Sequence, residues 1–253
     1  MLLKNKNAVI YGAAGSIGGA VARAFARDGA KVFLAGRTLD TLNKVAREII
    51  NEGGAAEVAQ VDALDSQVIE QHLDTIVQKA GSIDISFNAI WIQGILGTPL
   101  IQMPCEDFTL PILTGVKTNF LTATAAARHM ILQKSGVILT LSSSSAGLSG
   151  RDHKYHLTGG FGTACAAIEA LSRSLAGELG PQGIRVACLR SDAIPETWNT
   201  DADEVRTYME NGTVLGRLPT LVEVANAAVF MASDRASAMT GTIANLTCGS
   251  IMD

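Results

Sequence analysis

The sequence is poor in aromatic and in charged residues. Aromatics make up 5% of the 253 residues and charged residues 17%, whereas hydrophobic residues make up 47%. The interior must therefore be built mainly from Ala, Gly, Val, Ile and Leu, which suit a parallel sheet covered on both faces by closely packed helices. The length is compatible with one α/β domain, and we expect a single domain over residues 1–253.

Three further shortages exclude whole classes of protein. A net charge of −4 leaves no basic surplus for a nucleic-acid surface. No apolar run reaches the roughly 18 residues needed to span a bilayer, and no signal-peptide pattern precedes the first apolar segment. The four cysteines show neither CxxC nor Cys/His spacing, so we expect no disulfide framework and no metal site. The sequence predicts a soluble, cytoplasmic protein whose thiols stay reduced: Cys105, Cys165, Cys188 and Cys248.

Apolar runs of strand length alternate with helical segments along the whole chain. The segment Leu39–Glu52, for example, carries its apolar residues at helical spacing. This β-α-β-α order with short connectors predicts a Rossmann-type, doubly wound parallel sheet with helices on both faces. The expected strands are Ala8–Tyr11, Lys31–Ala35, Ala56–Val61, Ile83–Phe87, Val137–Leu141, Arg185–Leu189 and Thr242–Leu246. The expected helices are Ser16–Asp28, Leu39–Glu52, Gln67–Ala80, Phe108–Gln133, Phe161–Leu179 and Leu221–Met231.

Three long irregular stretches follow predicted strands: residues 89–106, 144–160 and 191–215. In an open α/β sheet the ligand crevice lies outside the carboxyl ends of the strands. We therefore expect these loops to form the walls of a substrate site. The first is rich in apolar side chains, which favours an apolar small-molecule substrate.

A glycine-rich turn joins the first predicted strand to the first predicted helix. Gly12 permits the tight turn, Gly15 allows the backbone to approach a pyrophosphate, and Gly18 lets the helix press against the sheet. Ser16 and Ile17 begin the helix, whose free N–H groups attract phosphate. In this strand-turn-helix-strand setting, the segment predicts a dinucleotide site.

The end of the second strand indicates which dinucleotide is bound. A carboxylate there would mark NAD(H), but the sequence has Arg37 and Thr38, which can hold a 2′-phosphate. NADP(H) is therefore favoured over NAD(H), although Arg37 can also be an ordinary surface residue. Asp62, after the third strand, is placed either to contact the adenine or to cap a helix.

Several phrases together resemble the short-chain dehydrogenase/reductase family over essentially the whole chain: YGAAGSIG, VDALD, SIDISFNA, GVILTLSSSSAG, ALSRSLAGELGPQGIRV and LGRLPTLVEVANAAVFMASDRASAMTG. The resemblance implies hydride transfer between a nicotinamide cofactor and a carbonyl or alcohol. It also implies that Ser143, or Ser144 with a shift of one residue, orients the substrate oxygen. Asn88 and Thr197 match family positions at the cofactor.

The same resemblance exposes departures at the catalytic positions. In the family a Tyr is the acid/base, and a Lys four residues later lowers its pKa. These positions hold Phe161 and Cys165, neither of which can do that chemistry. The family's relay Asn is replaced by Gly115, and Asn119, one turn further on, is a candidate to stand in. The usual Pro-Gly after the sixth strand reads Ser191-Asp192.

Replacement acids are available in the run of residues 151–156. Tyr155 follows Ser143 at nearly the family spacing, and His153 and His156 carry imidazoles, which titrate near neutral pH. The alternative is a solvent-exposed polar loop, because Thr158-Gly159-Gly160 separates Tyr155 from the next helix. The thiol of Cys165 is expected to be inert packing.

Three functions are compatible with these residues. We favour an NADP(H)-dependent oxidoreductase with an atypical active site, acting on a small carbonyl, alcohol or alkene. The first alternative is a non-catalytic NADP(H)-binding protein acting as sensor or partner, and the second is an enzyme of non-redox chemistry on this fold. The resemblance also implies a homo-oligomer, a dimer or tetramer, formed through the helices Phe108–Gln133 and Phe161–Leu179.

Overall fold

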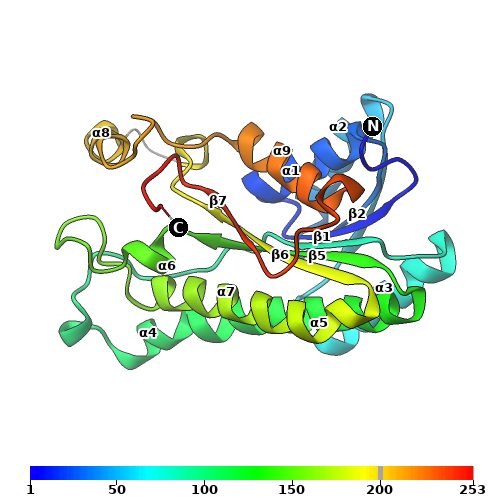
Figure 1. Ribbon diagram of the computed structural model, residues 1–253, viewed down its shortest axis with the longest axis horizontal. Coiled ribbons are helices and arrows are strands. Elements are labelled where there is room, and N and C mark those ends of the chain that lie inside the picture. Colours follow the sequence, from blue (N-terminus) through cyan, green and yellow to red (C-terminus); the bar gives the residue numbers. More distant parts are fainter. Residues whose placement is uncertain (199–201, 253) are drawn as a thin grey trace.

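A seven-stranded parallel sheet forms the centre of the protein in the computed structural model, which describes residues 1–198 and 202–252 (Figure 1). The strand order is β3-β2-β1-β4-β5-β6-β7, and every neighbouring pair is parallel. The predicted Rossmann-type fold class is confirmed. The strands are β1 (Asn7–Tyr11), β2 (Lys31–Gly36), β3 (Ala55–Gln60), β4 (Ile85–Asn88), β5 (Gly136–Ser143), β6 (Ile184–Ser191) and β7 (Ile243–Leu246).

Helices cover both faces of the sheet, and a hydrophobic core lies between each helical layer and the strands (Figure 1). Because successive strand residues point to opposite faces, each central strand supplies both cores and must be apolar throughout. One layer contains α1 (Ser16–Arg27), α2 (Leu39–Asn51) and α9 (Leu221–Ala232). The other contains α3 (Ser66–Ala80), α5 (Lys117–Gln133) and α7 (Gly159–Leu179).

Side-chain caps mark the starts of α3 and α9, close to where the sequence predicts these helices to begin. Asp65 caps α3 by accepting hydrogen bonds from the backbone N–H groups of Gln67 and Val68. Thr220 and Glu223 form a reciprocal capping box at the start of α9. Such caps satisfy N–H groups that lack a partner within the helix, and each contributes about 1 kcal/mol.

The strand order places a topological switch point between β1 and β4. The chain builds outward from β1 to β3, then returns to β4 on the other side of β1. Crossovers run in opposite directions from these two strands, so a crevice opens at their carboxyl ends, where α/β proteins bind ligands. The glycine turn follows β1, and the predicted substrate loops follow β4, β5 and β6. The fold therefore brings both to one edge of the sheet.

Two regions differ from the sequence prediction. The expected helix Phe108–Gln133 begins earlier, as α4 (Cys105–Pro111), and passes through a π-helical turn at Ile112–Val116 before α5. Pro111 lacks an N–H and crowds the preceding turn, which accounts for the local widening. Two expected loops contain short helices, α6 (Ser145–Leu148) and α8 (Asp203–Asn211). The 3₁₀ turns are Leu100–Gln102, Gly180–Gln182, Pro195–Thr197 and Asp234–Ala236.

The described residues contain neither a membrane-spanning helix nor a cluster of metal ligands. None of the helices there has the length and apolarity needed to cross a bilayer. Within residues 1–198 and 202–252, no three His, Cys, Asp or Glu side chains are grouped so as to hold a metal ion.

Candidate functional site

Two glycines of the turn after β1 lie too close to neighbouring backbone to carry a side chain. Gly12 has φ +74°, and a Cβ there would lie 2.7 Å from the carbonyl oxygen of Ala89. A Cβ on Gly18 would lie 2.3 Å from the carbonyl oxygen of Gly12. Both positions therefore require glycine, for the turn and for the close approach of α1. These are the roles that the sequence assigns to them.

The N-terminus of α1 fits a pyrophosphate. Gly15 is the N-cap residue and has no side chain with which to satisfy the first N–H groups of the helix. Gly15 and Ser16 are exposed and Ile17 is half-buried, so the backbone there is open to a ligand. Free N–H groups and the helix dipole both favour a phosphate at this point.

Arg37 and Thr38 lie exposed at the end of β2, beside the glycine turn in the sheet. In the described part of the chain, the Arg37 guanidinium has no carboxylate partner. Only its backbone carbonyl is bonded, by Gln60. The Thr38 hydroxyl is equally uncommitted, because Thr38 precedes α2 without a side-chain cap. A cation and a hydroxyl are thus both available to an anionic ligand.

Asp62 does not cap a helix. Its carboxylate accepts from the backbone N–H of Leu64, and the cap of α3 is Asp65 instead. This corrects the helix-cap alternative for Asp62 and leaves its exposed carboxylate at the edge of the adenine region as a prediction.

The two other predicted cofactor residues are tied to the protein. Asn88, at the end of β4, is buried, donates to the Thr122 hydroxyl at 3.0 Å and accepts from the N–H of Ile90 at 3.0 Å. Thr197 donates its hydroxyl to the carbonyl of Ile194 at 2.8 Å. Both side chains shape the loops at the crevice in this structure, and direct cofactor contact stays a prediction.

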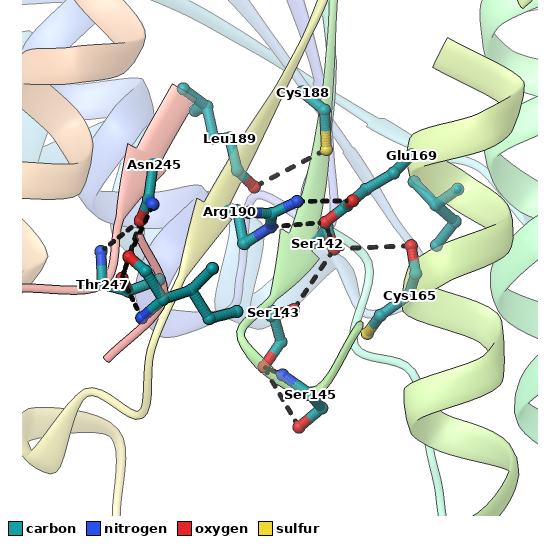
Figure 2. Close-up of polar contacts among 12 residues, drawn as sticks. Ser142, Ser143, Ser145, Cys165, Glu169, Cys188, Leu189, Arg190, Asn245 and Thr247 are labelled. Carbon is teal, nitrogen blue, oxygen red and sulfur yellow. Dashed lines mark hydrogen bonds and ion pairs between the residues drawn. The ribbon is translucent and has the colours of Figure 1, made fainter. Parts of the chain in front are cut away.

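The consecutive serines at the end of β5 have three different environments. Ser142 is buried and lies 2.9 Å from Glu169 Oε1, whereas Ser144 donates to Asp192 at 2.8 Å. Ser143 lies between them, is half-buried and contacts only Ser145 through its hydroxyl (Figure 2). The Ser143 hydroxyl is therefore the one of the three that is not already bonded to a carboxylate.

A buried ion pair lies directly behind these serines. Arg190 on β6 makes two hydrogen bonds to Glu169 on α7, from Nε to Oε1 at 2.7 Å and from Nη2 to Oε2 at 2.8 Å (Figure 2). The two side chains are only 9% and 6% exposed. The bidentate geometry compensates for the loss of hydration, and the Ser142 hydroxyl contacts the same carboxylate.

Phe161 and Cys165, at the positions expected for the family's Tyr and Lys, are both removed from solvent to different degrees: Phe161 is half-buried and Cys165 is buried. Phe161 and Cys165 are on α7, and Phe161 packs against a cluster that includes Ile92 and Cys188. Burial raises the pKa of the Cys165 thiol to about 12, so the thiol stays protonated and unreactive at neutral pH. Neither the Phe161 ring nor the Cys165 thiol can therefore supply a proton at neutral pH.

The neighbouring relay position is closed as well. A Cβ on Gly115 would lie 3.0 Å from the Ile92 side chain, which fills the space that an asparagine would need. Asn119 is buried one turn further on and donates to the Gly115 carbonyl at 2.9 Å. Its Oδ1 is buried without a hydrogen-bond partner in the described structure, so Asn119 keeps one free acceptor beside the site.

Cysteine labelling tests this description of the thiols. Cys105 is exposed, whereas Cys165 and Cys188 are buried and have pKa values raised to about 12. Under native conditions at pH 7.5, a maleimide should modify Cys105 within minutes and leave Cys165 and Cys188 unmodified until the protein unfolds. Mass spectrometry of peptides from native and denatured samples measures this. Rapid native labelling of Cys165 would contradict the buried placement.

The loop before α7 and the helix α8 form a second polar network. Asp152 accepts from His156 Nδ1 and, at 2.6 Å, from the Tyr208 hydroxyl. Tyr155 points instead toward Glu204, at 3.0 Å, and its ring lies 4.4 Å from that of Tyr208. Tyr155 is therefore engaged with α8, whereas His156 is held by a carboxylate.

A cavity of about 240 Å³ lies between this network and the ends of β5 and β6. Its lining includes His156 but not Tyr155, and most of the other lining groups are polar: Arg151, Asp192, Tyr208, Asn211 and Ser250. Asp192 connects the cavity to the serine segment, because it accepts from Ser144 on one oxygen and from Ser250 on the other. The structure therefore places His156, rather than Tyr155 or the exposed His153, at a cavity that Asp192 connects to the serine segment.

Sequence reasoning did not predict two of these features. The Glu169–Arg190 pair had a detectable signal, since a charged residue in a buried strand needs a partner. The contact of Tyr208 with Asp152 had none, because α8 lies in a stretch predicted as irregular. Only the folded chain shows which residues of α8 meet the loop.

Comparison with known proteins identifies the family. The family model described as enoyl-(acyl carrier protein) reductase matches residues 12–250. The chain is 31% identical to a 7α-hydroxysteroid dehydrogenase of Escherichia coli, covering 99% of this chain and 96% of that protein. It is 28% identical to a 3-oxoacyl-(acyl-carrier-protein) reductase of Chlamydia muridarum, covering 98% of each.

Solved structures agree with the sequence relatives. A short-chain type dehydrogenase/reductase from Mycobacterium marinum has a TM-score of 0.87 and 32% sequence identity, over 99% of this chain and 97% of that one. Fold, glycine turn and sequence likeness thus point to one group of enzymes. The chain belongs to the short-chain dehydrogenase/reductase family of oxidoreductases.

Proposed function

We propose that this protein is an NADP(H)-dependent oxidoreductase with an atypical active site, acting on a small carbonyl or alcohol. The observation that supports NADP(H) most directly is the Arg37 guanidinium, exposed at the end of β2 beside the glycine turn and without a carboxylate partner in the described structure. An arginine at this point pairs with a 2′-phosphate, whereas an NAD(H) site has a carboxylate.

The proposed division of labour between cofactor and protein follows from the site. When bound, the nicotinamide supplies the hydride, which is the difficult part of the chemistry. Gly12, Gly15, Ser16, Ile17 and Gly18 hold the pyrophosphate through backbone N–H groups, and Arg37 with Thr38 holds the 2′-phosphate. Ser143 orients the substrate oxygen by a hydrogen bond.

The relatives support a reaction at a carbonyl or alcohol, since they are named as a 3-oxoacyl reductase and a hydroxysteroid dehydrogenase. The cavity lined by His156 and Asp192 does not contain the apolar loop 89–106 on which an apolar substrate was expected. Trp91 and Ile101 of that loop are 81% and 94% exposed, whereas the cavity is lined by polar side chains together with Leu148 and Met209. We therefore favour a small polar substrate.

Arg37→Ala tests the cofactor assignment. The substitution should weaken NADPH binding by about 10- to 100-fold, because a charge-assisted hydrogen bond to a phosphate contributes about 1.5–3 kcal/mol. NADH binding should stay within about twofold, since NADH has no 2′-phosphate. Isothermal titration calorimetry of NADPH and NADH measures both affinities.

Arg47→Ala is the matched control, because Arg47 is an exposed arginine whose Nε bonds only to its own helix, at the Asn43 carbonyl. It should leave both affinities unchanged. An equal loss of NADPH and NADH affinity in Arg37→Ala would argue against a 2′-phosphate contact. Failure of the wild-type protein to bind either nucleotide would overturn the proposed function.

A second candidate is a protein that binds NADP(H) without catalysis. The observation in its favour is the apolar packing of Phe161 and the burial of Cys165 at the positions expected for the family's Tyr and Lys. Turnover decides between the two: a non-catalytic protein binds NADPH tightly but oxidises it with no member of a carbonyl panel.

We also propose a homo-oligomer formed through α5 and α7, which lie side by side on one face of the sheet (Figure 1). The outer face of α7 exposes small residues that permit close approach, including Thr163, Ala166 and Ala170, and α5 exposes Phe120 to 50%. Sedimentation velocity measures the subunit number.

A further inference from the structure

We propose that Asp152 and His156 form an acid/base dyad that supplies the proton Phe161 cannot, acting on a small hydroxylated carbonyl compound bound in the adjoining cavity. This inference rests on the proposed oxidoreductase function and names the proton donor and substrate class of the same site. It is carried by the hydrogen bonds of the dyad, by the position of its free nitrogen and by the groups lining the cavity.

The carboxylate of Asp152 is fixed from two sides. Its Oδ1 accepts from the backbone N–H groups of Lys154 at 2.8 Å, Tyr155 at 2.7 Å and His156 at 3.3 Å. Its Oδ2 accepts from Tyr208 and faces Nδ1 of His156. This is the arrangement of an acid/base histidine oriented by a third group.

Charge at the dyad favours an acid/base role for the imidazole. The Tyr208 hydroxyl above all, together with the backbone N–H groups and His156, holds the pKa of Asp152 well below its usual range. Asp152 therefore stays ionised at neutral pH and binds the proton on Nδ1 of His156. The other charged or titratable groups at the cavity are Arg151 on the same loop, Tyr208 on α8 and Asp192 after β6.

The second ring nitrogen is available to a substrate. Among the described residues, Nε2 of His156 has no hydrogen-bond partner, and the side chain is 12% exposed at the wall of the cavity. Asp192, also on the wall, is bonded to Ser144, the neighbour of Ser143. The imidazole therefore borders the same cavity as Asp192, and Asp192 connects that cavity to the serine segment at the end of β5.

The lining selects for hydroxyl groups. Asp192 is an acceptor, Arg151 a donor, and Asn211 and Ser250 can do both. A hydroxylated carbonyl compound can pair with Arg151 and Asn211, whereas Asp192 already accepts from Ser144 and Ser250 and can accept one further hydroxyl.

The step balances without another reactant. In the direction of reduction, the carbonyl carbon gains a C–H bond from the hydride that the reduced nicotinamide provides. The C=O π pair moves to the oxygen, which takes the proton from Nε2 of the imidazolium form of His156, while Nδ1 keeps its own proton toward Asp152. The substrate is reduced, the cofactor is oxidised, and the neutral imidazole recovers its proton from water. Asp152 remains a carboxylate throughout, as a positioning residue.

His156→Gln tests the proposal, with His153→Gln as the matched control because His153 is exposed on the same loop. The probes are NADPH with glyceraldehyde, dihydroxyacetone and erythrulose. In His156→Gln, kcat/KM should fall by about 100-fold or more, the usual contribution of a general acid. NADPH affinity and thermal unfolding should match those of His153→Gln.

Imidazole NMR of the protein without substrate gives a readout independent of turnover. The ¹⁵N shifts of His156 should report the tautomer with the proton on Nδ1, and Asp152→Asn or Tyr208→Phe should shift that equilibrium. Active wild-type protein whose rate survives His156→Gln would overturn the dyad alone. NADPH binding without turnover on any carbonyl would overturn the proposed function and the dyad with it.

Discussion

Arg190→Met should lower the free energy of unfolding by about 3–5 kcal/mol, the expected cost of leaving one member of a buried ion pair without its partner. Glu169 would remain 6% exposed between α7 and β6, and its two hydrogen bonds from Arg190 would be lost. Methionine fills much of the volume of the arginine, so the decrease in the free energy of unfolding reflects the unpaired charge of Glu169 rather than a new cavity. Urea unfolding followed by circular dichroism measures it.

The double variant Glu169→Leu/Arg190→Met distinguishes the net contribution of the ion pair from the cost of leaving Glu169 buried without its partner. Replacing both charges with apolar residues should restore most of the stability, because neither ion must then be stripped of water. A double variant as unstable as Arg190→Met would show that the pair itself stabilises the fold. Ser142 would keep the Cys165 carbonyl, 3.4 Å away, as an acceptor in both variants.

Gly18→Ala should destabilise the protein by about 1–3 kcal/mol and weaken dinucleotide binding by at least about tenfold. The new methyl group would lie 2.3 Å from the Gly12 carbonyl oxygen, so α1 must move away from the turn. That movement displaces the N–H groups at the start of α1 that are proposed to bind the pyrophosphate. Calorimetric titration with NADPH and thermal unfolding measure the two effects.

Gly177→Ala is the control for Gly18→Ala. Gly177 lies in α7, and a Cβ there would meet no atom within 4 Å. It should stabilise the protein by about 0.5–1 kcal/mol, because alanine restricts the unfolded chain, and leave NADPH binding unchanged. If Gly18→Ala bound NADPH as tightly as Gly177→Ala, the turn could not be the pyrophosphate site.

Features encoded by short stretches of chain could be predicted from the sequence. The parallel sheet follows from short apolar runs of strand length. These runs alternate along the chain with segments of helical periodicity, such as Leu39–Glu52. The turn at Gly12 and Gly18 follows from residues that tolerate conformations and contacts that a side chain forbids. The prediction that Phe161 and Cys165 replace the family's Tyr and Lys likewise needs only the spacing of these two residues from a phrase that resembles the family.

The roles of the polar residues around the site depended on the tertiary structure. Ser142, Ser143 and Ser144 are identical in sequence, yet alternation along β5 turns Ser142 toward Glu169 and leaves Ser143 half-exposed. Asp152 meets Tyr208 across 56 positions of the chain. No local periodicity encodes such a contact, since it depends on how two loops pack at the sheet's edge.

The sequence alone therefore determined the fold and the position of the glycine turn after β1. The packing of α7, α8 and the intervening loops decided which serine is free, which charges are paired and which histidine borders a cavity. The physical reason is that backbone propensity and side-chain periodicity act over a few residues, whereas hydrogen bonds between distant segments form only once the sheet has brought them together.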